Sequence, residues 1–369
     1  MYSLLTASKH HLLLSEIATY HVLMIERRAV IVRLEPILEQ MRLLGRFLGC
    51  RRYVWNRALA IQLQRLNDGL TLLTYCQLAK LLTEWRNDEE TGWLADAPVH
   101  TQQATLKDLD LAFQRWRQGT SRRPRFKKRG TGESIRYPDQ KQIKFDFTTH
   151  DADGRSLLPR IFLPKLGWVK FRQSQDIPGK VCNVTVSYKA GHYYAAIQVE
   201  IEISPQVIPR TDENTVGGDI GICHFLVLSD GTEIDKPVHI DRIEMRLAEA
   251  QRKLSRMTRG SKNHTKQKKR IQRLHRKVSC ARRDFLHKAS AKVSKNHVYV
   301  QLEDAKVSRM LQTSRSEQPE GQLFSPPDEW FHRRLLDIGW AMFLFYLDYK
   351  LRARGGQLIL VNPAYTSQE

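Results

Sequence analysis

Two acidic side chains lie in short apolar runs that are typical of buried strands. Asp219 lies within Val-Gly-Gly-Asp-Ile-Gly-Ile at residues 216–222, and Glu303 lies within Val-Tyr-Val-Gln-Leu-Glu-Asp at residues 298–304. A carboxylate in such a run costs free energy unless it binds something positive, most often a metal ion. Basic residues between the two runs favour a phosphate substrate, so the pair predicts Mg²⁺-dependent chemistry on a phosphate backbone.

Each acid also has an explanation that needs no metal. Asp219 alone is equally well explained as a turn or capping aspartate, and Glu303 alone as a strand-end acid that caps the next helix. Both acids in one α/β segment favour the metal site, because ribonuclease-H-like folds place acids on neighbouring strands. There they hold two Mg²⁺ ions about 4 Å apart. Gly218 and Gly221 flank Asp219 and predict close approach by another backbone or a ligand.

The segment between the two acids is strongly basic. Residues 251–292 contain sixteen lysines and arginines and a single acid, Asp284. A break at Gly260-Ser261 divides the segment, so two antiparallel helices joined there would present a long basic ridge. The alternative is a solvated coiled-coil face, but such faces usually mix both signs of charge. We therefore predict that this ridge contacts nucleic acid.

The composition of the whole chain agrees with a polyanionic partner. The 369 residues carry a formal net charge of +21, which favours nucleic acid over an anionic membrane surface. No apolar run of about 20 residues occurs, so we predict no membrane span. The five cysteines form no Cys-x-x-Cys pair, and we expect reduced, buried thiols in a cytoplasmic protein, with neither disulfides nor a zinc site.

Hydrophobic periodicity divides the chain into successive segments. Alternating runs such as 143–147, 168–171, 183–187 and 193–199 predict the strands of a small β-barrel. Further on, residues 216–228 predict one strand, the Asp230-Gly231 dipeptide predicts a tight turn, and strands then alternate with helices, which is typical of α/β domains. We expect a non-structural leader at 1–23, a first barrel strand at 24–36, a helical lobe at 37–120, the barrel at 121–209 and an α/β domain at 210–369.

Taken in order, the motifs of this chain resemble the TnpB (OrfB) family of insertion-sequence proteins. These are RNA-guided DNA nucleases related to type V CRISPR effectors, and the similarity extends from about Glu26 to Gln368. It rests on Gly49–Asn56 (Gly-Cys-Arg-Arg-Tyr-Val-Trp-Asn), Pro124–Lys128, Leu163–Gly167, Asn183–Ser187, Gly217–Gly221, Gly260-Ser261, Arg283–Lys288, Glu303-Asp304 and Val361–Gln368.

The resemblance implies an α+β multidomain fold. Its parts would be a wedge-type β-barrel with an inserted helical recognition lobe and a ribonuclease-H-like (RuvC) α/β nuclease domain. It also implies a guide RNA that pairs with double-stranded target DNA in the cytoplasm, while the protein supplies shape recognition and charge neutralisation. Asp219 matches the first of the family's three Mg²⁺-binding acids, and Glu303 matches the second.

The predicted nucleic-acid contacts lie in the shared motifs and on the basic ridge. They are Arg51, Arg52, Tyr53, Asn56, Arg125, Phe126, Lys127, Lys128, Lys266, Lys269, Arg270, Arg273, Arg282, Arg283, His287 and Lys288. Aromatic residues near these cations (Tyr53, Trp55, Trp116 and Phe126) have the chemistry to stack on bases, but we expect each of them to pack in a helical core instead.

Two departures from the family pattern lead to further expectations. The family's zinc ribbon and third acid follow the Pro-Ala-Tyr-Thr-Ser-Gln motif, but this sequence ends at Glu369. We therefore expect no zinc ligands, an incomplete two-metal Mg²⁺ site and weak or absent cleavage. In addition, the polar stretch Gln312–Pro327 predicts an insertion after the Glu303 strand.

Three functions remain open from the sequence. The first is a TnpB-like transposon-encoded protein that binds guide RNA and target DNA and carries an impaired nuclease site. The second is a nuclease-dead, RNA-guided DNA-binding transcriptional regulator, although such a protein would have no need to retain both Asp219 and Glu303. The third is a basic protein that binds nucleic acid without a guide.

Overall fold

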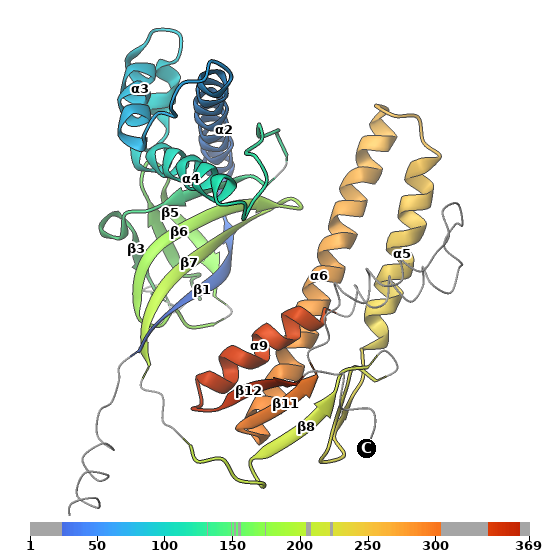
Figure 1. Ribbon diagram of the computed structural model, residues 1–369. Coiled ribbons are helices and arrows are strands. Elements are labelled where there is room, and N and C mark those ends of the chain that lie inside the picture. Colours follow the sequence, from blue (N-terminus) through green and yellow to red (C-terminus); the bar gives the residue numbers. More distant parts are fainter. Residues whose placement is uncertain are drawn as a thin grey trace, which may run out of the picture. The chain divides into compact units, whose positions relative to one another are not determined.

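A computed structural model gives the fold of the chain (Figure 1). The residues that it describes are 24–130, 132–148, 150, 153, 156–173, 175–203, 208–221, 224–303 and 339–361. They form two compact units, an N-terminal unit of Ile25–Glu202 and a C-terminal unit that takes in Ile203–Glu369. The expected leader at 1–23, Asp304, the expected insertion Gln312–Pro327 and the motif residues 362–368 lie outside the described residues.

The N-terminal unit is built on a curled seven-stranded sheet with the order β2-β6-β7-β1-β5-β4-β3. Its strands are β1 (Met24–Glu35), β2 (Ser134–Tyr137), β3 (Lys144–Asp146), β4 (Arg160–Leu163), β5 (Gly167–Arg172), β6 (Lys180–Lys189) and β7 (His192–Ile203). Val30, Val32 and Leu34 of β1 are all buried, because alternate side chains of a strand point to the same face. The strands predicted from the four alternating runs are confirmed as β3, β5, β6 and β7.

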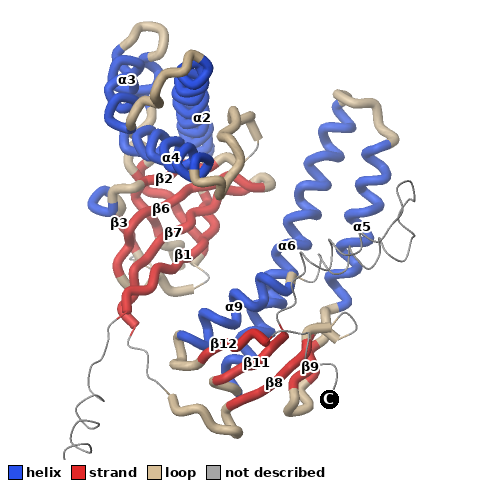
Figure 2. The backbone as a smooth tube through the Cα atoms, viewed as in Figure 1, coloured by secondary structure: helices blue, strands red, loops and turns tan. Residues whose placement is uncertain are grey.

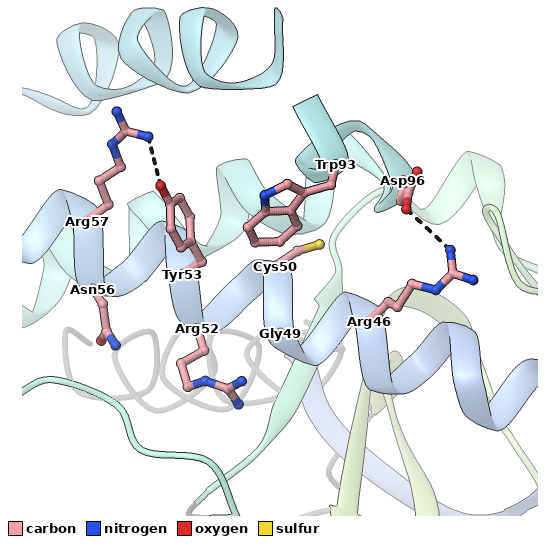
Figure 3. Close-up of a pocket in the computed structure, with 9 residues that line it drawn as sticks. All are labelled: Arg46, Gly49, Cys50, Arg52, Tyr53, Asn56, Arg57, Trp93 and Asp96. Atoms are coloured by element: carbon pink, nitrogen blue, oxygen red, sulfur yellow. Dashed lines mark hydrogen bonds and ion pairs between the residues drawn. The ribbon is translucent and has the colours of Figure 1, made fainter. Parts of the chain in front are cut away.

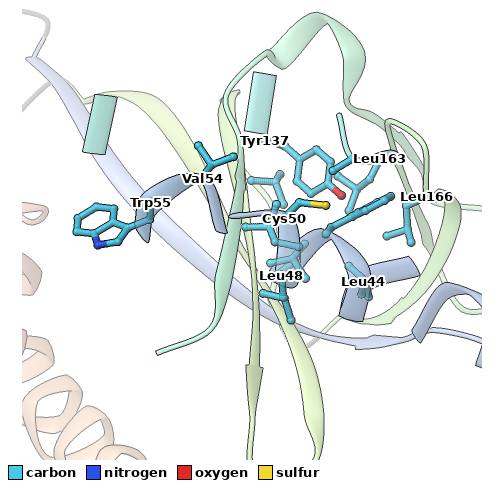
Figure 4. Close-up of a cluster of buried hydrophobic side chains, with 14 of the residues drawn as sticks. Leu44, Leu48, Cys50, Val54, Trp55, Tyr137, Leu163 and Leu166 are labelled. Carbon is cyan, nitrogen blue, oxygen red and sulfur yellow. The ribbon is translucent and has the colours of Figure 1, made fainter. Parts of the chain in front are cut away.

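Helices gather at one end of this sheet (Figure 1). They are α2 (Leu38–Asn67), α3 (Tyr75–Asn87), the 3₁₀ helix η2 (Gly92–Asp96) and α4 (Val99–Arg117). Leu44, Leu48 and Val54 line the buried face of α2, and they share one core with Tyr137 of β2 and Leu163 of β4 (Figure 4). The core that holds α2 in place is therefore the core of the sheet as well.

The C-terminal unit contains a five-stranded sheet with the order β10-β9-β8-β11-β12 (Figure 2). Its elements are β8 (Thr215–Asp219), β9 (Leu226–Leu228), β10 (Glu233–Ile234), α5 (Val238–Ser255), α6 (Lys262–Asn296), β11 (Tyr299–Glu303), α9 (Trp340–Arg352) and β12 (Gln357–Val361). β8, β11 and β12 run parallel, whereas β9 and β10 are antiparallel additions. Leu286 of α6 and Phe343 of α9 pack with Val300 of β11 in one buried core.

The expected single strand at 216–228 is wrong. The chain leaves the sheet after Asp219 and returns as the antiparallel strand β9 at Leu226. The reversal is tight at Gly221, where an added Cβ would lie 2.9 Å from the carbonyl oxygen of His224. The turn predicted at Asp230-Gly231 is confirmed, since Gly231 has a φ of 82° and Leu228 N–H donates to Thr232 O at 2.9 Å.

The cysteines were expected to be buried, and this is wrong for most of those that the structure describes. Cys50 is buried, but Cys182 is half-buried, and Cys76 and Cys280 are exposed because they lie on the solvent faces of α3 and α6. All four are free thiols. Cys223 lies outside the described residues.

Candidate functional site

Asp219 and Glu303 lie side by side at one edge of the C-terminal sheet. β8 and β11 are parallel neighbours, registered from Thr215 opposite Tyr299 to Gly218 opposite Leu302. The next residue of each strand is the acid, so the two carboxylates occupy matching positions on strands about 4.8 Å apart. Because side chains alternate along a strand, both acids lie on the face opposite to that of Leu302, which belongs to the core.

Gly218 permits this close arrangement of strands. A Cβ at this position would lie 2.6 Å from Leu228 Cδ2, 2.9 Å from the carbonyl oxygen of Val227 and 3.1 Å from Leu302 Cδ2. No larger residue fits without moving β9 or β11. The backbone approach predicted from the glycines that flank Asp219 is therefore confirmed at Gly218, as it is at Gly221.

The acid pair has the chemistry of a site for a hard divalent cation. Asp219 is exposed and Glu303 is half-buried, so solvent reaches both residues. Carboxylate oxygens together with water are the ligands that Mg²⁺ prefers. Within the described ranges, no cluster of three or more His, Cys, Asp or Glu side chains is arranged to hold a metal ion. The described residues thus place two candidate ligands, Asp219 and Glu303, on adjacent strands.

The basic ridge predicted from the sequence is a helical hairpin of α5 and α6 (Figure 1). Ser261 caps α6 by accepting a hydrogen bond from His264 N–H at 3.1 Å, and the buried Gln267 side chain donates to Ala250 O of α5 at 2.8 Å. Four of the predicted contact residues are exposed along α6, namely Lys266, Lys269, Arg270 and Arg273. Their charges face solvent and are available to phosphates.

The predicted contacts in the second half of α6 differ from one another in exposure and in their ion-pair partners. Arg282 is half-buried and its guanidinium donates to Glu244 Oε1 at 2.9 Å, so this cation ties α6 to α5. Arg283 is exposed. Lys288 is also exposed and pairs with Asp284 one turn earlier, with 2.7 Å between Nζ and Oδ2.

His287 is held by the last helix of the described chain. Its ring stacks on Tyr346 of α9, with 3.9 Å between centroids and an interplanar angle of 13°. Burial lowers the pKa of His287, and the nearby Lys350 and Arg283 cations lower it further. The imidazole is therefore neutral near pH 7 and offers a hydrogen bond or a ring face rather than a charge.

The second basic cluster, residues 121–130, is fixed to α2 of the N-terminal unit. Trp55 Nε1 donates to Arg125 O at 3.0 Å, and the Asn56 side chain forms hydrogen bonds with both the N–H and the C=O of Lys127. Lys127 Nζ lies 3.6 Å from the centroid of the Trp55 ring. Two motifs that are 70 residues apart in the sequence thus form one structural unit.

The expectation of core packing is wrong for Phe126 and correct for its three aromatic companions. Phe126 is 52% exposed, and its neighbours Arg125 and Lys128 are also exposed. Trp55 is buried, and Tyr53 and Trp116 pack against the core while remaining partly accessible. Trp55 and Asn56 hold the backbones of Arg125 and Lys127 and together form a clamp. The Phe126 ring between these two residues points outwards, away from the helical core.

Arg51 and Arg52 mainly join structural elements. The guanidinium of Arg51 lies 3.4 Å from Asp108 Oδ2 of α4 and donates to Ser134 Oγ at 3.3 Å, and its side chain is 13% exposed. Arg52 Nη1 lies 3.1 Å from Glu133 Oε1. These ion pairs hold α2 against α4 and against the entry to β2.

Tyr53 lies on the wall of a cavity of ≈ 520 Å³ between α2 and η2 (Figure 3). Arg46, Gly49 and Arg57 of α2 and Trp93 of η2 line the same cavity. Arg46, Arg57 and Trp93 were not among the residues predicted to contact nucleic acid. Helical spacing from Tyr53 would have identified both arginines, but no sequence signal brings Trp93 next to them.

Comparison with known proteins gives the class of this chain. A family model for the OrfB protein of IS605 elements, described as a probable transposase, matches residues 196–314. A companion model described as a helix-turn-helix domain matches residues 24–69. Over that range the structure contains the strand β1 followed by a single helix, α2.

Two curated relatives cover most of the chain. "Putative RNA-guided DNA endonuclease InsQ" of Escherichia coli (strain K12) is 40% identical over 336 residues, which is 91% of this chain and 80% of InsQ. "Putative RNA-guided DNA endonuclease" of Streptomyces pristinaespiralis is 29% identical over 346 residues, covering 93% of this chain and 79% of that protein. The chain belongs to the TnpB (OrfB) family of insertion-sequence proteins.

Among solved structures, a Cas12f1 complex with sgRNA and target DNA is similar over 92% of this chain and 86% of that chain. Its sequence identity is 14% and its TM-score is 0.28, which is too low to establish a shared fold. None of the helices that the structure describes has the length and apolar character needed to cross a lipid bilayer.

Proposed function

We propose that this chain binds a guide RNA and a double-stranded target DNA, and that Asp219 and Glu303 are the first two acids of a RuvC-type, Mg²⁺-dependent DNA nuclease site. The observation that carries the proposal is the register of β8 and β11, which puts the two carboxylates next to each other at one sheet edge. Membership of a family whose relatives are named RNA-guided DNA endonucleases supports the same activity.

The two units can be assigned to the two parts of this proposal, nucleic-acid binding and cleavage. In the proposal, the curled sheet with β1 at 24–36 and the remaining strands within 121–209 is the wedge domain, and the helices within 37–120 form the recognition lobe. Residues 210–369 belong to the RuvC-like domain. The exposed cations of α6 and of residues 121–130 would neutralise phosphates, while base pairing between guide and target supplies sequence specificity.

Each group at the candidate site has a defined task. The carboxylates of Asp219 and Glu303 would hold the cation against the scissile phosphate, and Gly218 keeps the two strands close enough for both to reach it. When bound there, Mg²⁺ would activate a water molecule and stabilise the leaving oxygen. The exposure of Asp219 leaves room for the phosphate to enter.

A direct test is to purify the chain and to sequence the RNA that accompanies it. One abundant RNA species is expected, and the complex should then bind DNA complementary to that RNA. Random RNA, or none, would contradict guided binding. Metal-dependent cleavage of the complementary DNA by the wild type, together with its loss in Asp219→Asn, tests the nuclease separately from guide binding.

The adjacent positions of Asp219 and Glu303 also bear on the second function left open by the sequence, a nuclease-dead RNA-guided regulator. A DNA-binding regulator without nuclease activity has no use for two carboxylates aligned on adjacent strands. Binding of guided DNA by the wild type with no cleavage under any Mg²⁺ or Mn²⁺ concentration would favour that regulator over the nuclease.

A further inference from the structure

The cavity beside α2 contains a glycine that packing does not explain. Gly49 lies in the interior of α2, where glycine lowers helix stability relative to alanine. A Cβ at Gly49 would meet no atom within 4 Å, so no neighbouring group requires its absence. Gly49 instead lines the cavity and leaves the helix backbone open to it (Figure 3).

The walls of this cavity carry a fixed aromatic surface. The rings of Tyr53 and Trp93 meet edge to face, with 5.1 Å between centroids and an interplanar angle of 69°. Arg57 Nη1 donates to Tyr53 Oη at 2.9 Å and fixes the orientation of that ring. Tyr53 packs against the core, but Trp93 is 44% exposed. Part of the indole surface is therefore accessible to a ligand.

The rim of the cavity is positively charged. Arg46, Arg52 and Arg57 line it together with a single carboxylate, that of Asp96. Arg46 Nη1 lies 3.3 Å from Asp96 Oδ2, and both side chains are largely exposed, at 62% and 49%. Exposed ion pairs contribute little to stability, so a phosphate can replace Asp96 as the partner of Arg46 at little cost.

We propose that this cavity takes one unpaired nucleotide of a bound nucleic-acid strand. The base would lie on the Trp93 and Tyr53 rings above Gly49, and its phosphate would bind Arg46. Aromatic rings combined with cations are the usual device for holding single strands, and a cavity of ≈ 520 Å³ is within the size range of small-ligand sites. The inference rests on the proposed function, and it adds a preference for unpaired over paired strands, which charge alone does not provide.

The test measures binding of the full chain to labelled 15-nucleotide strands by fluorescence polarisation. Single-stranded RNA, single-stranded DNA and the corresponding duplexes form separate arms, so the source of the nucleotide is identified. Gly49→Leu places a branched side chain in the cavity beside the rings, and Trp93→Ala removes the stacking surface. Gly45→Leu is the matched control, because Gly45 lies one turn earlier in α2, has no atom within 4 Å of an added Cβ and does not line the cavity.

Gly49→Leu and Trp93→Ala should each weaken single-strand binding by roughly 5- to 100-fold and leave duplex binding unchanged. Gly45→Leu should bind like the wild type. Both leucine variants replace a helical glycine by a better helix former, so a loss confined to Gly49→Leu is not a folding defect.

Two results would overturn the cavity assignment while leaving the proposed function intact. One is single-strand binding by Gly49→Leu and Trp93→Ala equal to that of Gly45→Leu. The other is an equal loss on single strands and duplexes, since the cavity would then be part of a general cationic surface. If the wild type binds neither RNA nor DNA in any arm, the proposed function fails, and this inference fails with it.

Discussion

The side-chain amide of Asn56 holds the backbone of Lys127 at two points. Its Nδ2 donates to Lys127 O at 3.1 Å, and its Oδ1 accepts from Lys127 N–H at 2.8 Å. A segment without helix or strand, rich in like charges, would otherwise sample many conformations. This contact holds the backbone at Lys127 against α2 while the neighbouring Phe126 ring is exposed.

Replacing Asn56 should release this segment. Asn56→Ala leaves two backbone groups of Lys127 without partners, which costs about 1–3 kcal/mol of stability. Trypsin should then cleave within residues 121–130 much faster than in the wild type, as followed by mass spectrometry. Gln64→Ala is the control on the same helix, because the Gln64 side chain reaches only Asp68. Equal cleavage rates in the wild type and Asn56→Ala would contradict the clamp.

A pair of glycines in β8 tests the packing of the candidate metal site. Gly218→Ala places a methyl group 2.6 Å from Leu228 Cδ2 and 2.9 Å from a backbone oxygen, so it should destabilise the C-terminal unit by about 1–3 kcal/mol. Gly217→Ala should be tolerated, since the nearest atom to its Cβ is Ser229 Oγ at 3.9 Å. Urea unfolding of both variants measures the difference. If the two variants unfold alike, the close approach of β8 to its neighbours is wrong.

Lys127 should make nucleic-acid binding depend on pH. Burial lowers the pKa of Lys127 to about 8, well below its ordinary 10.5. The side chain is charged below that pH and loses its proton as the pH rises, so affinity for a polyanion should fall between about pH 7 and 9. Lys127→Arg keeps its charge over this range and should remove the dependence, whereas Lys128→Arg should not. Binding curves at four pH values would check this, and an identical fall in Lys127→Arg would count against it.

The basic ridge should act through phosphate contacts. Replacing Lys269 and Arg273 by glutamate should weaken binding to all sequences alike and reduce the slope of log K against log salt by about 1 for each phosphate contact that is lost. Lys144→Glu, at an exposed lysine outside the ridge, is the control, and its charge change equals that of either ridge substitution alone. An unchanged salt slope in the ridge variant would exclude α6 from the interface.

The sequence predicted the elements of this fold better than their contacts. Alternation in residues 183–187 and 193–199 identified β6 and β7, because the period of side chains along a strand is a local property. The break between β8 and β9 was missed, because apolar residues occur on both sides of it, from Val216 in β8 to Leu226 in β9. In the folded chain a Cβ at Gly221 would lie 2.9 Å from the carbonyl oxygen of His224, so the close approach after β8 requires glycine at this position.

For the candidate sites too, the sequence predicted residues but not the contacts between them. Asp219 and Glu303 were identified from their strands, but their alignment depends on the pairing of β8 with β11 across the 83 residues that separate the two acids, which no local pattern gives. Phe126 was expected in a core because aromatic residues usually are buried, and the Trp55 and Asn56 contacts with its neighbours decide otherwise. Trp93 meets Tyr53 only through the packing of η2 on α2.

Asp219 and Glu303 should together bind one divalent cation. Titration with Mn²⁺, followed by calorimetry, should show binding by the wild type that weakens at least tenfold in Asp219→Asn and in Glu303→Gln. The loss in the double variant should be smaller than the sum of the two single losses in free energy, because the two carboxylates act on the same cation. Asp212→Asn, a change at an exposed acid outside the sheet, should leave binding unchanged. Wild-type affinity in both single variants, or losses that add, would contradict a shared site.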